Sequence, residues 1–282
     1  MARIALLIVA LAALAGCSPA TPLNWVSGSS AVEEERSLSY GPLPRHRYDL
    51  YTPTDAPDAP LVVFVHGGSW YDGSKDIYRF LGTALADEGY SAAVINYRLA
   101  PDTLFPGFVE DAALAVDHFL SEAHDRPVVM MGHSAGAQIA ALVAYDSRYL
   151  AAYGRDNCAV SGFVGVSGPY DFLPLRQQRF RVAFPQETRA LSQPIAFASG
   201  PNPPSLLIHS RDDRVVHVED TELMSAALRQ NQQSVEVALY DDAGHINIIG
   251  AMSRYLRDWA PTFEDTLAFL DAQRDAGFPG CG

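Results

Sequence analysis

A glycine-flanked serine stands where a covalent catalyst would place its nucleophile. Residues 130–136 are Met-Met-Gly-His-Ser-Ala-Gly, between an apolar run and an alanine-rich run at 135–145. This arrangement predicts a strand that turns sharply into a helix, with Ser134 at the apex of the turn. Side chains at positions 132 and 136 would clash there, so glycine is expected at both. The pattern predicts Ser134 as a nucleophile beside a helix N-terminus, where developing negative charge is stabilised.

A serine hydroxyl is a weak nucleophile at neutral pH, so it needs a base and an acid that orients the base. His245 follows the last predicted strand in the run Asp-Asp-Ala-Gly-His, and we predict it as the base. Asp213 follows the preceding strand and is predicted as the acid, with its neighbour Asp212 as the alternative. Five other histidines are weaker candidates. His133 lies inside the elbow and points away from the serine, and His217 lies at a helix start. Segments that look exposed carry His46, His118 and His124.

A second glycine-rich segment offers donors for an oxyanion. His66-Gly67-Gly68-Ser69-Trp70 ends a continuous apolar run at 61–65, which predicts a strand buried on both faces. Adjacent glycines allow backbone N–H groups to turn toward a carbonyl oxygen. We therefore predict an oxyanion hole formed by Gly68, Ser69 and Ala135, where losing one donor typically costs about 3–4 kcal/mol in the transition state.

The hydrophobic pattern predicts the elements that position these residues. An antiparallel hairpin is expected at a sheet edge within 36–53, followed by alternating strands and helices. The predicted strands are 61–65, 91–97, the strand before Ser134, 160–166, 205–209 and 235–240, and the predicted helices are 75–88, 108–123, 135–145, 219–229 and 261–272. This rhythm predicts a mostly parallel sheet with helices on both faces. Residues 168–204 are proline-rich and break the rhythm, so we predict that this cap segment forms a pocket wall over the carboxyl ends of the strands.

Composition narrows the class of protein. The chain has 282 residues, 48% of them hydrophobic, and a formal net charge of −13. The length suits one large α/β domain, expected over 36–282. The negative charge argues against nucleic acid or an anionic membrane surface as a partner through long-range attraction. We find no metal-type spacing of cysteine and histidine and no glycine-rich phosphate loop, so we expect neither a metal nor a cofactor; the oligomeric state stays open.

The first 16 residues have the pattern of a signal peptide rather than of a domain helix. Arg3 precedes an apolar run at 4–15, which is short for a bilayer span. Leu-Ala-Gly-Cys17 resembles the lipoprotein box of bacteria, in which the cysteine is lipidated, and Ser18 resembles the pattern sent to the outer membrane. Ordinary secretory cleavage, leaving a soluble periplasmic protein, is the alternative. Residues 17–35 are predicted to be a flexible tether.

Export would place the cysteines in an oxidising compartment. A disulfide between Cys158 and Cys281 is then a hypothesis. Cys281 lies in a glycine- and proline-containing tail, and terminal segments of this kind are often poorly ordered, so the pairing stays open.

Taken together, these motifs resemble those of serine esterases of the α/β-hydrolase fold, in the branch of carboxylesterases, feruloyl-esterase-like proteins and kynurenine formamidases. The matching segments are Tyr40-Gly41 with Asp49-Leu50-Tyr51, His66 to Trp70, Asn96 to Pro101 with Phe105-Pro106, Gly132 to Gly136, Ser167 to Asp171, Asp213, and Gly244-His245. His-Gly-Gly-x-Trp resembles the formamidase version of the oxyanion loop, whereas Tyr-Arg-Leu-Ala-Pro resembles hormone-sensitive-lipase relatives. Those relatives carry a third glycine where this chain has Ser69, and a long N-terminal cap that it lacks, so no large lipid-binding lid is expected.

The resemblance implies an eight-stranded sheet and a serine hydrolase that cleaves small carboxylic esters through an acyl-enzyme. One alternative is an N-formyl amide hydrolase of the kynurenine pathway, which would use the same residues; export argues against it, because that substrate is made in the cytoplasm. Another is a non-catalytic binding module, but such proteins usually lose the serine, the histidine or an oxyanion glycine, and this chain keeps all of them.

Overall fold

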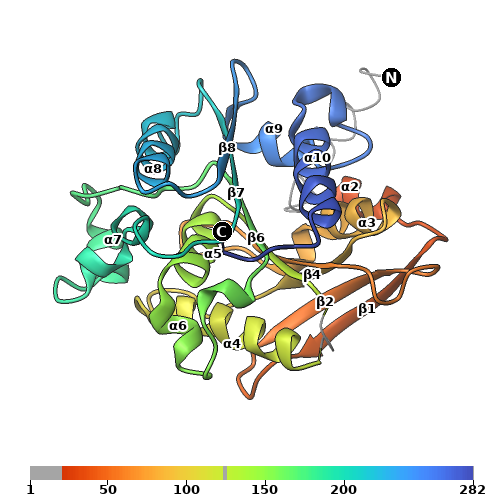
Figure 1. Ribbon diagram of the computed structural model, residues 1–282, viewed down its shortest axis with the longest axis horizontal. Coiled ribbons are helices and arrows are strands. Elements are labelled where there is room, and N and C mark those ends of the chain that lie inside the picture. Colours follow the sequence, from red (N-terminus) through yellow and green to blue (C-terminus); the bar gives the residue numbers. More distant parts are fainter. Residues whose placement is uncertain (1–20, 123–125, 282) are drawn as a thin grey trace.

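An eight-stranded sheet forms the centre of the molecule (Figure 1), and the computed structural model describes residues 21–122 and 126–281. The strands lie in the order β1-β2-β4-β3-β5-β6-β7-β8. Their bounds are β1 Val32–Ser39, β2 Arg47–Pro53, β3 Leu61–Val65, β4 Ser91–Ile95, β5 Val128–His133, β6 Gly162–Val166, β7 Ser205–Ser210 and β8 Val235–Tyr240. The pairs β1–β2 and β2–β4 are antiparallel and all the others are parallel, so the predicted mostly parallel sheet with an edge hairpin is confirmed. The predicted signal peptide, Cys17 and His124 lie outside the described residues.

Helices cover both faces of the sheet, and each face has its own apolar core. One core is covered by α4 Gly107–Glu122, α5 Ala135–Tyr145, α6 Ser147–Ala151 and α8 Val218–Gln230, and the other by α2 Thr21–Val26, α3 Arg79–Asp87, α9 Gly244–Gly250 and α10 Thr262–Asp275. In β3, Val63 and Val65 face the first core, and Val62 and Phe64 face the second. A strand buried on both faces needs the unbroken apolar run that the sequence carries.

The remaining elements are short. The helix α7 spans Gln178–Ala183, and single turns of 3-10 helix occur at η1 Lys75–Ile77, η2 Asn157–Ala159, η3 Arg189–Ser192, η4 Pro194–Phe197 and η5 Arg257–Trp259. The helix predicted over 75–88 is divided into η1 and α3, and Gly89 follows it with a φ of +82°, as a glycine after a helix end often does. No helix among residues 21–122 and 126–281 is both long and apolar enough to span a bilayer.

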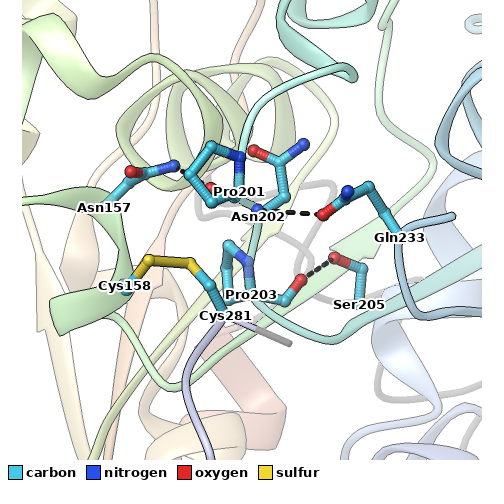
Figure 2. Close-up of a disulfide and its surroundings, with 8 residues drawn as sticks. All are labelled: Asn157, Cys158, Pro201, Asn202, Pro203, Ser205, Gln233 and Cys281. Carbon is cyan, nitrogen blue, oxygen red and sulfur yellow. Dashed lines mark hydrogen bonds between the residues drawn. A yellow bond between two sulfur atoms is a disulfide. The ribbon is translucent and has the colours of Figure 1, made fainter. Parts of the chain in front are cut away.

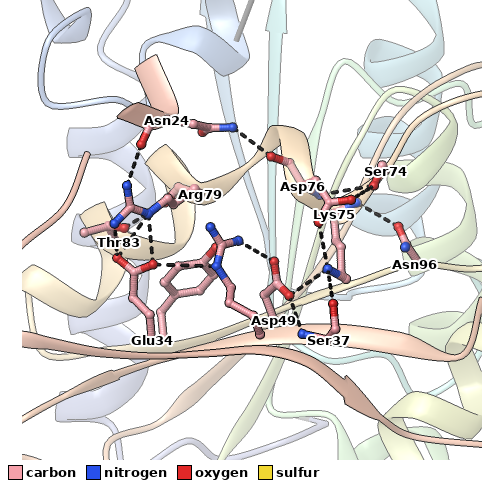
Figure 3. Close-up of polar contacts among 12 residues, drawn as sticks. Asn24, Glu34, Ser37, Asp49, Ser74, Lys75, Asp76, Arg79, Thr83 and Asn96 are labelled. Carbon is pink, nitrogen blue, oxygen red and sulfur yellow. Dashed lines mark hydrogen bonds and ion pairs between the residues drawn. The ribbon is translucent and has the colours of Figure 1, made fainter. Parts of the chain in front are cut away.

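The prediction of a flexible tether over 17–35 is wrong for residues 21–35, which form α2, a short connection and the first half of β1 (Figure 3). The guanidinium of Arg79 joins both elements to α3, because it donates to Asn24 O at 2.6 Å and to Glu34 Oε1 at 2.7 Å. The acidic run at 33–35 looked like a solvated tether in the sequence. It lies instead in a strand that pairs with β2, and its charge is partly balanced by arginine.

A buried lysine fastens the edge hairpin to the segment after the predicted oxyanion loop (Figure 3). Lys75 Nζ donates to Asp49 Oδ1 at 2.7 Å, to Asp76 Oδ1 at 2.8 Å and to Ser37 Oγ at 3.2 Å. Its backbone N–H donates to Asn96 Oδ1 at 2.7 Å. Removing one partner of such a buried pair commonly costs about 3–5 kcal/mol. The hairpin therefore braces the chain where it leaves the loop at 66–70.

The C-terminal tail is joined covalently to the fold (Figure 2). Cys158 and Cys281 form a disulfide with a Cα–Cα distance of 5.0 Å, so the hypothesis of their pairing is confirmed. The bond lies beside the loop that leads into β7, where Asn157 donates to Pro201 O and the Asn202 N–H donates to Gln233 Oε1.

Candidate active site

Ser134 lies at a sharp turn between β5 and α5, in a backbone conformation that a non-glycine residue rarely adopts. Its φ and ψ are +55° and −126°. A Cβ added at Gly132 would lie 2.3 Å from Gly136 O, and one added at Gly136 would lie 2.1 Å from Val65 O. The predicted need for glycine at both positions is therefore confirmed. The turn leaves Ser134 beside the first N–H groups of α5, which carry partial positive charge.

The structure brings the three predicted residues Ser134, His245 and Asp213 into one hydrogen-bonded chain. Ser134 Oγ lies 3.0 Å from His245 Nε2, and His245 Nδ1 lies 2.7 Å from Asp213 Oδ2. The residues come from the end of β5, the start of α9 and the loop after β7. In parallel strands these carboxyl ends meet at one edge of the sheet.

The surroundings of Asp213 keep it ionised. Its side chain is buried, and burial alone would raise the pKa of this carboxyl. Hydrogen bonds from His209, His245 and the Val215 N–H outweigh burial and hold the pKa of Asp213 well below its usual range. Asp213 Oδ1 accepts from the N–H groups of Val215 and Val216 at 2.8 and 3.0 Å, which leaves Oδ2 for the imidazole of His245.

Asp212, the alternative acid, is exposed and has a different contact. Its Oδ1 accepts from the Gly244 N–H at 2.8 Å and from the Ser210 hydroxyl. The Ser210 oxygen in turn accepts from the Gly244 N–H at 3.0 Å. Asp212 therefore holds the backbone just before His245, while Asp213 contacts its ring. The sequence favoured Asp213 over Asp212, and Asp213 is the carboxylate that contacts the imidazole.

Two further histidines, neither of them among the predicted site residues, support the site. His209 is buried at the end of β7, with Nε2 3.0 Å from Val216 O and 3.5 Å from Asp213 Oδ2. Because Val216 O can only accept, His209 Nε2 carries a proton and also faces the carboxylate. The signal was present in the sequence as a histidine at a strand end, four residues before Asp213.

His133 does not reach the Ser134 hydroxyl, but it contacts the proposed base. Its Nε2 lies 3.0 Å from His245 O, and the two imidazole rings are 4.8 Å apart. Burial, helped by the nearby His245, lowers the pKa of His133 to about 3. His133 is therefore a neutral donor that holds the backbone of His245 in place.

Among the described residues, His46 and His217 form no hydrogen bond with the three residues of the chain that begins at Ser134. His46 is buried and its Nε2 lies 3.1 Å from Asp111 Oδ1, so the expectation that it is exposed is wrong. The sequence pattern does not indicate this contact, because Asp111 lies 65 positions after His46 in the chain. His217 is the residue before α8, as predicted.

The predicted oxyanion loop passes directly beside the nucleophile in a strained conformation. The φ angles of Gly68, Ser69 and Trp70 are +129°, +53° and +64°. A Cβ at Gly67 would lie 3.2 Å from the Cβ of Ser134, so glycine permits this close approach. Across the described parts of the chain, the N–H groups of Gly68 and Ser69 donate to no protein acceptor. They remain available to a substrate oxygen.

A buried glutamine holds this loop from the elbow helix. Trp70 Nε1 donates to Gln138 Oε1 at 2.9 Å, and Gln138 Nε2 donates to Ser192 O in the cap segment at 2.8 Å. The indole also packs against cap rings at centroid distances of 4.8 Å for Phe184 and 5.5 Å for Phe172. The sequence signal was a single polar side chain four residues after the serine in an otherwise apolar helix.

The arrangement suits covalent catalysis by a serine. A nucleophile, a base and an ionised acid are joined by hydrogen bonds, and the loop that carries the two N–H donors passes beside the nucleophile. Within the described ranges no group of three or more histidine, cysteine, aspartate or glutamate side chains could hold a metal ion.

The sheet order and the strand–serine–helix turn define the class of protein: the chain has the α/β-hydrolase fold. It belongs to the BD-FAE family, whose model matches residues 48–228.

Known relatives agree with this class. The chain is 30% identical over 242 residues to a probable isoprenylcysteine alpha-carbonyl methylesterase of Oryza sativa subsp. japonica, covering 76% of this chain and 57% of the relative. It is 30% identical over 161 residues to a kynurenine formamidase of Danio rerio, covering 52% of each chain. Esterase B from Lactobacillus Rhamnosis (HN001) has the same fold, with a TM-score of 0.76, 19% identity, and coverage of 99% of this chain and 100% of that one. The chain thus spans little more than half the length of these curated relatives.

Proposed function

We propose that the protein is a carboxylic ester hydrolase that works through an acyl-enzyme on Ser134. The observation that carries the proposal is the continuous hydrogen-bonded chain from Ser134 through His245 to Asp213, at 3.0 and 2.7 Å. Family membership and relatives named as esterases support the same chemistry. The expected substrate is a small molecule with an ester carbonyl.

In the first half-reaction, Ser134 Oγ attacks the ester carbonyl carbon while His245 Nε2 accepts the hydroxyl proton. The ionised Asp213 stabilises the imidazolium that forms and keeps the Nδ1 proton directed toward itself. The carbonyl oxygen becomes an oxyanion, and the N–H groups of Gly68, Ser69 and Ala135 are the proposed donors to it. The strained backbone of Gly68 and Ser69 is held in advance by the hydrogen bond between Trp70 and Gln138, so little reorganisation is needed when the charge develops.

The tetrahedral intermediate then expels the alcohol, which takes the proton from His245 Nε2. The acyl group remains on Ser134 Oγ. In the second half-reaction His245 Nε2 removes a proton from water, and the hydroxide attacks the acyl carbon. The intermediate breaks its bond to Ser134 Oγ, which takes the proton back from His245, and the carboxylic acid is released.

An N-formyl amide hydrolase is the second candidate, supported by the identity to a kynurenine formamidase over about half of this chain. The same nucleophile, base and acid would act on a formamide carbonyl. The non-catalytic alternative has little support, because a binding module has no need for an aligned serine, imidazole and carboxylate beside unpaired amide donors.

We further propose that the protein is exported and anchored through a lipid on Cys17, facing the periplasm from the outer membrane. Support comes from the sequence before Cys17 and from the Cys158–Cys281 disulfide, since such bonds persist in oxidising compartments. A soluble periplasmic form remains the alternative.

A rate series on the purified protein tests the activity. The series compares nitrophenyl esters of increasing acyl length, acetylated and feruloylated sugars, and N-formylkynurenine. Fast turnover of short esters, falling with acyl length, is the expected result. A formamide rate well above every ester rate would favour the second candidate instead.

Intact-mass measurement tests the mechanism separately. A slow ester or a fluorophosphonate should add one acyl or phosphonyl group to the wild-type chain and none to Ser134→Ala. Turnover without any adduct on the Ser134 peptide would overturn the acyl-enzyme proposal.

A further inference from the structure

The described part of the chain begins close in sequence to the proposed lipid anchor. Only Ser18, Pro19 and Ala20 separate Cys17 from Thr21, the first residue of α2. Four residue steps span at most about 14 Å even when fully extended. A lipid on Cys17 would therefore hold the surface beside α2 near the headgroups of the bilayer.

Large apolar side chains are exposed on that surface. Trp25 and Val26 at the end of α2 are 81% and 49% exposed, and Tyr255 and Trp259 are 50% and 46% exposed. We call these four residues the aromatic patch. Large contiguous apolar patches on a protein surface commonly mark a site that binds a partner or a membrane.

The patch is built from two distant segments held in contact. Val26 O accepts from the Tyr255 hydroxyl at 2.7 Å and from Arg254 Nη2 at 3.0 Å, and Arg254 Nη2 also donates to Gly28 O at 3.0 Å. Trp259 lies four residues beyond Tyr255 in the sequence, and its backbone N–H donates to Leu256 O. Figure 1 shows α2 beside α3, on the side of the molecule occupied by α9 and α10.

The charges around the patch suit a headgroup layer. The Arg254 guanidinium lies 5.0 Å from the centre of the Tyr255 ring and 3.7 Å from an oxygen of Asp87. The Arg257 guanidinium lies 3.6 Å from a carboxylate oxygen of Glu88. Asp258, which stands between Arg257 and Trp259 in the sequence, is exposed. The patch is therefore near neutral, although the chain carries −13 overall.

Tryptophan and tyrosine prefer the membrane–water interface, because their rings are apolar and their N–H and O–H groups stay hydrated. Arginine can donate to lipid phosphates in the same layer.

We propose that the aromatic patch lies in the headgroup layer of the membrane that anchors Cys17. The patch then orients the domain on the bilayer, while the lipid supplies most of the affinity. This inference rests on the proposed lipidation, but it is independent of the esterase activity.

Tryptophan quenching tests the proposal, because the chain has three tryptophans and one is an internal control. Trp70 is only 5% exposed and lies in the core. The lipidated full chain is placed in vesicles of phosphatidylethanolamine and phosphatidylglycerol with brominated acyl chains, which quench only nearby indoles. The variants are Trp25→Phe, Trp259→Phe and the double variant.

Bromination should quench the wild type, quench each single variant less, and leave the double variant, which reports Trp70 alone, almost unquenched. Equal emission from the wild type in brominated and ordinary vesicles would overturn the proposal. An N-terminal peptide whose mass shows no lipid on Cys17 would also overturn it. A dimer that forms without lipid and is broken by the double variant would overturn it too, because the patch would then bind a second copy of the chain. Ser134→Ala should lose turnover while its quenching stays at the wild-type level, which separates this surface from the proposed activity.

Discussion

Replacing the carboxylate of Asp213 by an amide gives the most discriminating test of the site. Asp213→Asn preserves the size of the side chain, and its amide oxygen can still accept from the Val215 and Val216 N–H groups at 2.8 and 3.0 Å. The change falls on the other oxygen, 2.7 Å from His245 Nδ1. An amide NH₂ there donates, so His245 must turn Nδ1 into an acceptor and move its proton to Nε2.

The size of the effect follows from that tautomer. Nε2 is the atom 3.0 Å from Ser134 Oγ, and once protonated it cannot accept the serine proton. The loss of the same charge in a serine protease triad lowers kcat by about 10⁴. This factor corresponds to about 5.5 kcal/mol of transition-state stabilisation.

Asp212→Asn is the matched control, one position away and with the same chemical change. In the wild type the Gly244 N–H lies 2.8 Å from Asp212 Oδ1. The amide oxygen of the variant can accept the same hydrogen bond, so the backbone before His245 keeps its support. A change of about twofold is expected, as for most surface substitutions. The assay is kcat and kcat/KM on the best ester of the rate series, with circular dichroism to confirm folding. If Asp213→Asn kept more than a tenth of the wild-type kcat, or if Asp212→Asn lost more, the assignment of the acid would be refuted.

The stability of Asp213→Asn relative to the wild type should also depend on pH. The pKa of Asp213 is lowered in the folded protein, so its charge stabilises the fold above its unfolded pKa, near 4 for an aspartate. That contribution is lost as the pH falls toward the folded pKa. The free energy of unfolding of the wild type should therefore exceed that of Asp213→Asn at pH 7, and the gap should narrow below about pH 4. A gap that widened in acid would contradict the ionised state of this carboxyl.

Three further changes test the nucleophile, the loop anchor and the disulfide. Ser134→Ala should reduce kcat by about 10⁶ with the fold intact, and substantial residual esterase activity in a pure sample would reject this nucleophile. Gln138→Leu leaves the Trp70 indole N–H without its buried partner, at a cost of about 1–3 kcal/mol. The variant should lower kcat more than it raises KM, and it should weaken binding of a trifluoromethyl ketone. An effect on KM alone would argue against an oxyanion role for the loop that Trp70 ends. Cys158→Ser with Cys281→Ser should lower the free energy of unfolding in urea by about 2–5 kcal/mol without changing kcat, and equal stability of the variant and the oxidised wild type would remove the structural role of the bond.

The sequence by itself predicted the strands of the sheet and the turn that carries Ser134, because both depend on local rules. An apolar β-branched run of five residues such as 61–65 favours a buried strand, and a serine between two glycines at a strand end favours a tight turn. The helix over 135–145 was predicted with its observed bounds for the same reason. The disulfide could be named as a hypothesis, since only a small number of pairings exist among three cysteines.

Only the tertiary structure decided how distant segments meet. It separated Asp213 from Asp212, because a difference of one position turns one carboxylate toward His245 and the other toward the backbone of Gly244. It brought Gln138 to Trp70 across 68 positions of sequence. It also folded residues 21–35 onto Arg79, so that an apparent tether became part of the domain. Side-chain direction and long-range contact depend on how the sheet and its helices pack together, and no local pattern in the sequence carries that information.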